Sequence, residues 1–221
     1  MYTVKIWIPL TLALLAGCSF PTAPEVRPPP GSVNRHGATS TLTFNRTSTF
    51  GVVYSPQTLK DLDYLNRYHD HALHSLEGRW LVSPIRQAYI ESSPPNVAID
   101  RVKQALDTVL PNVTFYSSTA AMTKAKPDFI VVVYTHHVLV TPRSSDIEAT
   151  FSAEFFSPNF GYLGCAEGHR AAHMPALWTH TQRTPEIVAQ LDSQRALQAS
   201  ALSDFENSLT KMVGNQTTAR E

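Results

Sequence analysis

Cysteine and histidine side chains that could bind a metal ion gather in the last third of this 221-residue chain. Cys165, His169 and His173 are four residues apart, which would place them on one face of a helix. The outer two would then lie about 12 Å apart, whereas zinc–ligand bonds measure about 2.0–2.3 Å, so at most two could bind one ion. Gly164 and Gly168 disfavour a regular helix. We expect a structured hairpin loop with a buried thiol, and a zinc or copper site using His169 and His173 is the alternative.

The other histidines are placed less well for a shared ion. His69, His71 and His74 fall within a predicted helix, where residues two apart point about 160° away from each other. We expect His69 to be half-buried and the other two to face solvent. His136 and His137 are neighbours in a predicted strand and point to opposite faces. One of them should face the helices, and the other should face solvent or a partner.

Sequence motifs of nucleophilic, metal-dependent and nucleotide-dependent enzymes are absent. The chain contains no Gly-x-Ser-x-Gly, His-Glu-x-x-His, Walker or Gly-x-Gly-x-x-Gly pattern. We therefore expect a protein that is not an enzyme and has no cofactor. A hydrolytic site remains as an alternative, and it would require His169 and His173 to meet Glu167 or Glu154 in one cleft.

The first cysteine follows a short apolar segment. Lys5 precedes ten residues from Ile6 to Leu15, and small residues follow at Ala16 and Gly17. A positive start, an apolar run and small residues are typical of a cleavable export signal. Ten helical residues span about 15 Å, which is half of the 30 Å hydrocarbon core, so the run is too short to cross a membrane.

Leu15-Ala16-Gly17-Cys18 resembles the lipobox of bacterial lipoproteins. The resemblance implies that Cys18 becomes the first residue of the mature chain and carries fatty acyl groups, palmitate among them. Ser19 follows where an aspartate often retains such proteins in the inner membrane, which favours the outer membrane. Several acyl chains on one residue would make release from the bilayer negligible. The alternative is an ordinary secretory signal that contains a cysteine.

Composition indicates one folded domain after a spacer. Acidic and basic side chains number 18 each and no basic run occurs, so we expect no nucleic-acid partner. Five prolines between residues 21 and 30 favour an extended spacer that could reach about 70 Å. We divide the chain into a signal peptide (1–17), a lipid-anchored linker (18–40), one periplasmic domain (41–214) and a disordered tail (215–221).

Hydrophobic periodicity predicts alternating helices and strands within the domain. Ser55 and Pro56 have the residue types of a helix N-cap and first position, and Gly78 suits the end of that helix. The apolar face of this helix should consist of Leu59, Leu62, Leu65, Ala72, Leu73 and Leu76. The remaining expected elements are strands within 41–54 and at 79–85, 113–116, 128–140, 147–155 and 177–183, and helices at 99–110, 119–125 and 185–212.

This order predicts an α+β fold, a mixed and mostly antiparallel sheet with helices mainly on one face and a long C-terminal helix. Trp80-Leu-Val-Ser-Pro84, Pro127-Asp128 and the strand around Trp178 resemble features of small periplasmic domains in envelope-assembly and transporter-auxiliary lipoproteins. That resemblance implies a non-catalytic domain that binds or organises cell-envelope proteins. Phe160 and Tyr162 are candidate partner contacts. A carrier of a lipid or another amphiphile, a metal-binding enzyme and a homo-oligomer are left open.

Overall fold

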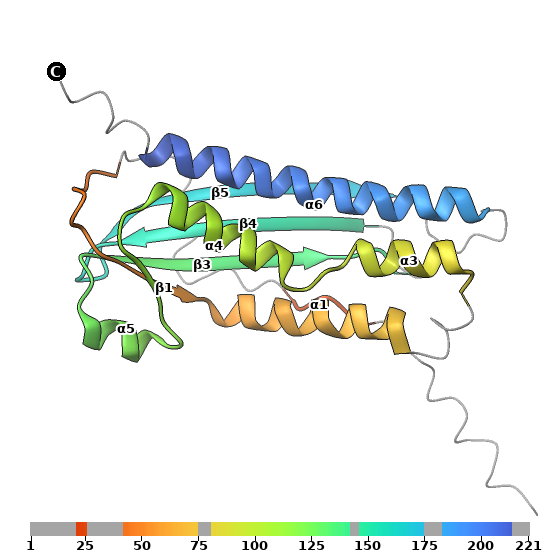
Figure 1. The fold of residues 1–221 in the computed structure, drawn as a ribbon, viewed down its shortest axis with the longest axis horizontal. Coiled ribbons are helices and arrows are strands. Elements are labelled where there is room, and N and C mark those ends of the chain that lie inside the picture. Colours follow the sequence, from red (N-terminus) through yellow and green to blue (C-terminus); the bar gives the residue numbers. More distant parts are fainter. Residues whose placement is uncertain (1–20, 26–41, 75–80, 142–145, 175–182, 214–221) are drawn as a thin grey trace, which may run out of the picture.

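The computed structural model describes residues 21–25, 42–74, 81–141, 146–174 and 183–213 (Figure 1). These residues form five strands and five helices along the described ranges. The strands are β1 (Phe50–Tyr54), β2 (Val113–Phe115), β3 (Phe129–Val138), β4 (Asp146–Phe156) and β5 (Tyr162–His173). The helices are α1 (Pro56–His74), α3 (Ser83–Glu91), α4 (Val97–Val109), α5 (Thr119–Ala125) and α6 (Thr184–Val213).

The strands form one sheet in the order β2-β1-β3-β4-β5. The short strand β1 pairs in parallel with β2 and β3, whereas the longer β3, β4 and β5 pair antiparallel. Helices α3, α4 and α6 lie over one face, and α5 packs against the other face at one end (Figure 1). The expected α+β fold with a mixed, mostly antiparallel sheet and a long C-terminal helix is therefore confirmed.

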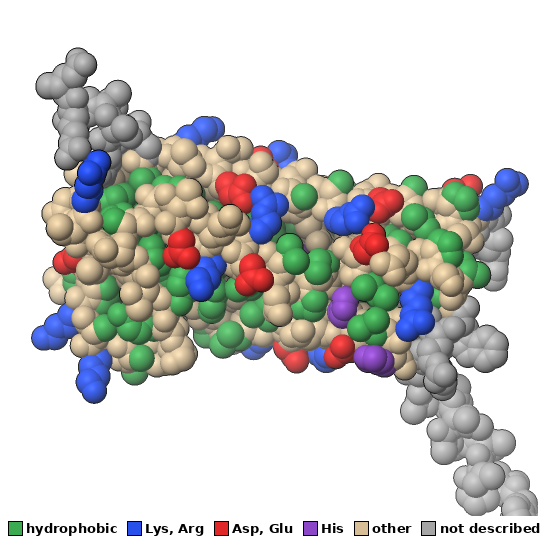
Figure 2. Space-filling model, in the orientation of Figure 1, with side chains coloured by type: hydrophobic (Ala, Val, Ile, Leu, Met, Phe, Trp, Pro, Cys, Tyr) green, Lys and Arg blue, Asp and Glu red, His purple; other side chains and the backbone are tan. Residues whose placement is uncertain are grey.

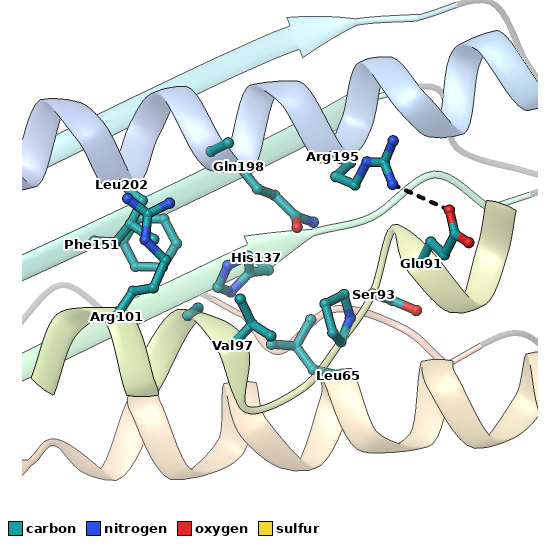
Figure 3. A pocket seen from close by; sticks show the side chains of 13 residues that line it. Leu65, Glu91, Ser93, Val97, Arg101, His137, Phe151, Arg195, Gln198 and Leu202 are labelled. Atoms are coloured by element: carbon teal, nitrogen blue, oxygen red, sulfur yellow. Dashed lines mark hydrogen bonds and ion pairs between the residues drawn. The ribbon is translucent and has the colours of Figure 1, made fainter. Parts of the chain in front are cut away.

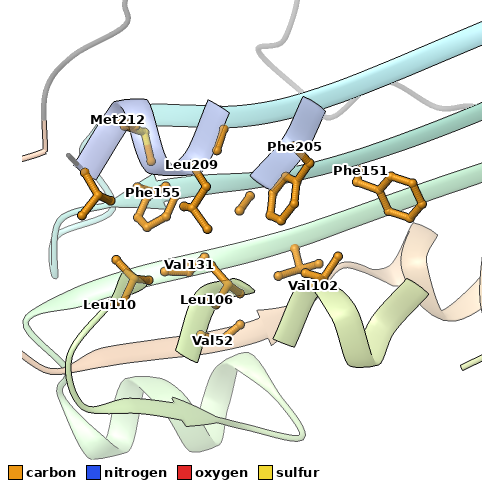
Figure 4. Close-up of a cluster of buried hydrophobic side chains, with 14 of the residues drawn as sticks. Val52, Val102, Leu106, Leu110, Val131, Phe151, Phe155, Phe205, Leu209 and Met212 are labelled. Carbon is orange, nitrogen blue, oxygen red and sulfur yellow. The ribbon is translucent and has the colours of Figure 1, made fainter. Parts of the chain in front are cut away.

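The main core lies between this sheet and helices α4 and α6 (Figure 4). Alternate residues of each strand point into it, because side chains of a strand alternate between the two faces of the sheet. Helix α6 contributes an apolar stripe at three- and four-residue spacing. The central members are Val52, Val102, Leu106, Val131, Phe151, Phe155, Leu202, Phe205 and Leu209.

Helix α1 takes the place of a strand beside β3 (Figure 1). Pairing between β1 and β3 ends at Tyr54 and Val133, but β3 continues to Val138. Helix α1 starts at this point, and the Ser55 hydroxyl accepts a hydrogen bond from the Thr58 backbone N–H at 3.1 Å, as the N-cap prediction requires. Side chains of α1 then satisfy backbone groups of β3 that would otherwise be buried without partners.

Thr58 and two tyrosines show how this substitution works. The Thr58 hydroxyl donates to the Val133 carbonyl at 2.9 Å and accepts from the Thr135 N–H at 3.0 Å. Nearly two turns further along α1, the Tyr64 hydroxyl accepts from the Leu139 N–H at 3.1 Å. The Tyr68 hydroxyl, which is fully buried, donates to the Val140 carbonyl at 2.6 Å. Burial raises the pKa of Tyr68 well above its usual value, so this hydroxyl stays protonated as a donor.

The buried face of α1 differs from the predicted one. Leu59 was expected in the apolar face but is 58% exposed, whereas Thr58, Asp61 and Tyr64 are buried. The apolar periodicity failed because the helix faces a strand edge as well as the core. A strand edge requires hydrogen-bonding side chains rather than leucines.

Two further segments differ from the predictions. Residues 83–91 form helix α3 rather than the end of a strand at 79–85, and Pro84 occupies its first turn. This position tolerates proline because the first N–H groups of a helix lack intrahelical partners. The segment expected to be a loop around Cys165 is the twelve-residue strand β5.

Helix α6 packs unusually close to β5 at Gly168. A Cβ atom at this position would lie 2.0 Å from the Ala201 carbonyl O and 2.3 Å from the Phe205 backbone N. Only glycine leaves room for the helix backbone here. Gly168, which in the sequence disfavoured a helix around Cys165, therefore determines how closely α6 approaches the sheet.

Several predictions concern residues outside the described ranges. These are Cys18 and the signal peptide, the tail, the helix end at Gly78, Trp80, and the strand around Trp178. Within the predicted linker, residues 21–25 are described, and Ala23 packs against a second buried cluster that includes Tyr68, Leu139 and Leu191. None of the described helices has the length and apolar character needed to cross a lipid bilayer.

Candidate functional site

The best-organised polar group in the described structure is the buried pair formed by Asp61 of α1 and His137 of β3. Their side chains are 0% and 2% exposed. Asp61 accepts hydrogen bonds from the Thr135 hydroxyl at 2.9 Å and from the His137 backbone N–H at 2.8 Å. The His137 Nδ1 lies 2.7 Å from the same carboxylate. Three donors around one carboxylate compensate for its removal from water.

This geometry determines which ring nitrogen of His137 carries a proton. Because a carboxylate only accepts hydrogen bonds, Nδ1 must donate to Asp61. In the neutral ring, Nε2 is then left as an acceptor. The ring packs edge-on to Phe151, with centroids 5.1 Å apart.

His137 forms part of the wall of a cavity of about 150 Å³ (Figure 3). The cavity lies under α4 and α6, over the core face of the sheet. Leu65, Val97, Phe151 and Leu202 supply apolar walls. The arrangement can hold a small molecule against the imidazole. No hydroxyl or thiol within the described residues forms a hydrogen bond with Nε2.

The expected division between His136 and His137 is wrong, because both are 2% exposed. They do point to opposite faces, and His137 faces the helices as expected. His136 lies in the row that also contains Thr150 and His169 on the other face of the sheet. Its buried Nδ1 makes no hydrogen bond within the described ranges, and burial lowers its pKa despite nearby Asp61 and Glu148.

The proposed metal ligands do not come together. Cys165, His169 and His173 share one face of β5, but residues four apart in a strand are separated by about 13 Å. His169 Nδ1 lies 3.0 Å from the Thr150 hydroxyl, and His173 Nδ1 lies 2.7 Å from Asp146. Across the described ranges, no three His, Cys, Asp or Glu side chains are arranged to hold an ion.

The remaining expectations for these residues have mixed outcomes. The Cys165 thiol was expected to be buried but is half-buried, with Sγ 3.5 Å from the Ala166 carbonyl O. Glu154 and Glu167 lie opposite Cys165 and Ser152 respectively, so they do not join the two histidines in a cleft. On α1, His69 is half-buried and His74 is exposed as expected, whereas His71 is half-buried rather than in solvent.

The two aromatic residues expected to contact a partner lie at the turn between β4 and β5. Phe160 is 53% exposed and has a positive φ of 60°, stabilised by its N–H donating to the Ser157 carbonyl at 2.9 Å. Tyr162 is half-buried and packs edge-on against Phe156 at 5.8 Å. Phe160 is therefore available to a partner, whereas Tyr162 partly covers its own sheet. Cys18 lies outside the described residues.

Charged groups on the helix-covered face are dispersed. Figure 2 shows basic and acidic side chains interspersed over this face, without a large patch of one sign. Several of them are paired, including Arg101 with Glu206 at 2.6 Å and Arg170 with Asp204 at 2.7 Å. The face is therefore close to neutral on a local scale.

Sequence reasoning missed Asp61, Gln194 and Gln198. One signal was present: Thr58, Asp61, Tyr64 and Tyr68 repeat at three- and four-residue spacing, so they share a helix face. That polar stripe was not recognised, because apolar residues on the same helix follow a similar period. Gln194 had no comparable signal, and its amide O accepts from the Val140 N–H at 2.7 Å.

Comparison with known proteins identifies no family. No protein-family model matches the chain, and no curated protein matches its sequence. A PelC dodecamer from Paraburkholderia phytofirmans in space group P6 is 11% identical and covers 76% of this chain and 93% of its own, with a TM-score of 0.34. A second PelC crystal, in space group C2, is 10% identical, covers 75% and 94%, and has a TM-score of 0.33.

A third structural neighbour is a "putative lipoprotein" from Caulobacter crescentus. It is 11% identical, with coverage of 78% of this chain and 93% of its own and a TM-score of 0.27. These scores are too low for the likeness to carry an argument about this chain.

Proposed function

We propose that this chain is a lipid-anchored protein of the bacterial cell envelope whose folded domain binds other envelope proteins and catalyses no reaction. The anchor is proposed from the lipobox-like segment that ends at Cys18. The observation that carries the binding role is the exposed end of strand β5 at the edge of the sheet.

Strand β5 pairs with β4 on one side and is last in the order of the described sheet. Its final five residues, 169–173, are all exposed. An exposed strand edge is a template for an added strand from another chain. Earlier in the strand, the Glu167 N–H points away from β4 and donates to the Ser208 hydroxyl of α6 at 3.1 Å. Helix α6 thus covers the middle of this edge and leaves its end accessible.

The buried pair of Asp61 and His137 supports a structural rather than a catalytic role. The Asp61 carboxylate accepts hydrogen bonds from the His137 backbone N–H and from the His137 imidazole, so it serves as a hydrogen-bond partner for strand β3. The pair joins α1 to the sheet at the place where β1 has ended.

A lipid carrier is a weaker alternative. Pockets for drug-sized ligands measure about 300–1,000 Å³, whereas the cavity at His137 measures about 150 Å³. A larger hollow of about 380 Å³ between α4 and α6 is more open, and Gln104, Thr108 and Thr210 give it a polar lining. Neither encloses an acyl chain in apolar surroundings.

The packing of Ala23 determines how far the domain can lie from a bilayer. Ala23 lies five positions after Cys18, and an extended chain of that length spans at most about 18 Å. If Cys18 carries the acyl groups, Ala23, where the chain packs on the second buried cluster, lies within this distance of Cys18. The predicted reach of about 70 Å would require Ala23 to detach from the folded domain, so that the whole linker is extended.

The binding role can be tested at Ala171. Because N–H groups alternate in direction along a strand, Ala171 points the same way as Glu167, away from β4. Ala171→Pro removes this N–H while leaving the ladder with β4 intact. We expect cross-linking of the full-length protein in native membranes to recover a specific envelope protein with wild type and with the matched Ala171→Ser control, but not with Ala171→Pro.

If the cross-linked partner is a second copy of this chain, and this product is lost in Ala171→Pro, the edge of β5 mediates self-assembly. Equal cross-linking of both variants, or no specific product from wild type, would refute the role of the edge. The anchor has an independent test, which is mass spectrometry of the native product. An intact leader or an unmodified Cys18 thiol would refute it.

A further inference from the structure

The cavity beside His137 contains polar groups that its structural role does not use. Nδ1 of His137 is engaged by Asp61, and Nε2 has no hydrogen-bond partner within the described residues. Across the cavity on α6, Gln198 has a buried amide Nε2 that also lacks a partner in these ranges. Figure 3 shows the Gln198 side chain reaching down toward His137 from the helix. The Gln198 Nε2 is a buried donor without a partner in the described ranges, which is costly, so a ligand that accepts from it would relieve that cost, and the same ligand could donate to the open Nε2 of His137.

Apolar side chains form much of the rest of the wall, and the hydroxyl of the lining residue Ser93 already donates to the Tyr89 carbonyl at 2.8 Å. Leu65 comes from α1, Val97 from α4, Phe151 from β4 and Leu202 from α6. Val97 is 51% exposed and stands at the mouth of the cavity. Such a cavity favours a ligand that is mostly hydrocarbon and carries few polar atoms.

Both arginines that line the mouth are paired with carboxylates. Arg195 pairs with Glu91 at 3.2 Å across the opening (Figure 3), and Arg101 pairs with Glu206 at 2.6 Å. Arg195 also pairs with Asp192 at 3.1 Å, so each guanidinium already has at least one carboxylate and the mouth offers no uncompensated positive charge to an anionic ligand. The complementary ligand is therefore neutral.

We infer that this cavity binds a single phenol-type ring, with the hydroxyl against His137 and Gln198. Its volume of about 150 Å³ matches that of an engineered apolar cavity known to bind benzene. A hydroxyl both donates and accepts, so it donates to Nε2 of His137 and accepts from Nε2 of Gln198. The ring packs on Phe151 and the aliphatic walls. This site depends on neither the anchor nor the edge of β5.

Calorimetric titration of p-cresol into the full-length protein in phospholipid nanodiscs tests the site. We expect one equivalent to bind per chain. Toluene has the same shape without the hydroxyl and should bind about tenfold more weakly, because two hydrogen bonds are lost. Absence of saturable p-cresol binding, or equal affinity for toluene, would overturn the proposal.

Two variants locate the binding. Val97→Trp fills the mouth and should abolish p-cresol binding, and Ala199→Trp, from the exposed side of α6, repeats the block independently. Val82→Trp is the matched control, because Val82 is also 51% exposed but does not line the cavity. The control also corrects for p-cresol dissolved in the lipid. Unchanged binding in both blocked variants would place the ligand elsewhere and refute the assignment.

The same titration with N-acetyl-L-tyrosinamide distinguishes two sources of the ring. Binding comparable to that of p-cresol indicates that the mouth admits a tyrosine side chain presented by a polypeptide. Binding of p-cresol alone indicates a free small phenol. Both results support the ring site, and failure of both compounds to bind refutes it.

Discussion

Replacing Gly168 by alanine tests the contact that positions α6 on the sheet. The new Cβ would lie 2.0 Å from the Ala201 carbonyl O and 2.3 Å from the Phe205 backbone N, and ordinary contact begins near 3.4 Å. Both neighbours are backbone atoms, so no side-chain rotation relieves the overlap. Helix or strand must therefore move by more than 1 Å.

The cost of this movement can be bounded. Overpacking a core typically costs about 1–3 kcal/mol, and here the displaced helix carries Leu202, Phe205 and Leu209 of the main core. We expect the free energy of unfolding of Gly168→Ala to fall by about 3 kcal/mol, at the upper end of that range. For a protein of this size, such a loss lowers Tm by about 6–12 °C.

Urea unfolding of the full-length protein, followed by far-ultraviolet circular dichroism, measures this change. Gly161→Ala is the matched control, because its Cβ would meet the Ser157 side-chain Oγ at 2.9 Å, and that side chain can rotate away. We expect the control to lose less than about 1 kcal/mol. A Gly168→Ala protein within about 0.5 kcal/mol of wild type would refute the close contact between β5 and α6.

Three further outcomes are expected from the same unfolding measurements. Asp61→Ala should lower the free energy of unfolding by about 3 kcal/mol or more, because it leaves buried donors unpaired. The control Asp63→Ala, at an exposed position of the same helix, should change it by less than about 0.5 kcal/mol. Equal losses would contradict the pairing of α1 side chains with the edge of β3. Phe205→Ala should lose about 3–5 kcal/mol, and a loss below 1 kcal/mol would show that the main core is wrongly placed. Burial lowers the pKa of His136 in the folded protein, so as pH falls the unfolded chain binds a proton at this histidine at a higher pH than the folded protein does. Wild-type stability should therefore fall as pH drops below about 6.5, and His136→Phe should reduce the slope of stability against pH. An unchanged slope would contradict the burial of His136.

Local patterns predicted much of the secondary structure. The alternation from residue 147 to 155, the β-branched run of β3 and the stripe of α6 were all found, because each depends on one buried face with a fixed period. The start of α1 was also predicted, since capping is decided within four residues. Residue 168 was noticed as a glycine, but its role against α6 depends on a helix more than thirty residues later.

The candidate site was only partly predictable. His137 was expected to face helices or a partner, yet nothing near it in sequence indicated Asp61, which lies 76 residues earlier. The cavity around the imidazole brings together α1, α3, α4, β4 and α6, so no single segment carries its signature.

Residue types and their periods determined by themselves that this chain forms an α+β body and where its long helices and central strands lie, and they predict an export-type segment before it. These properties depend on interactions between residues only a few positions apart. Tertiary structure alone decided that a polar helix face replaces a strand beside β3, that a glycine-containing segment extends the sheet, and that a buried imidazole borders a cavity. Each of these depends on contacts between distant segments, because a buried backbone or carboxylate must find its partners wherever the fold places them.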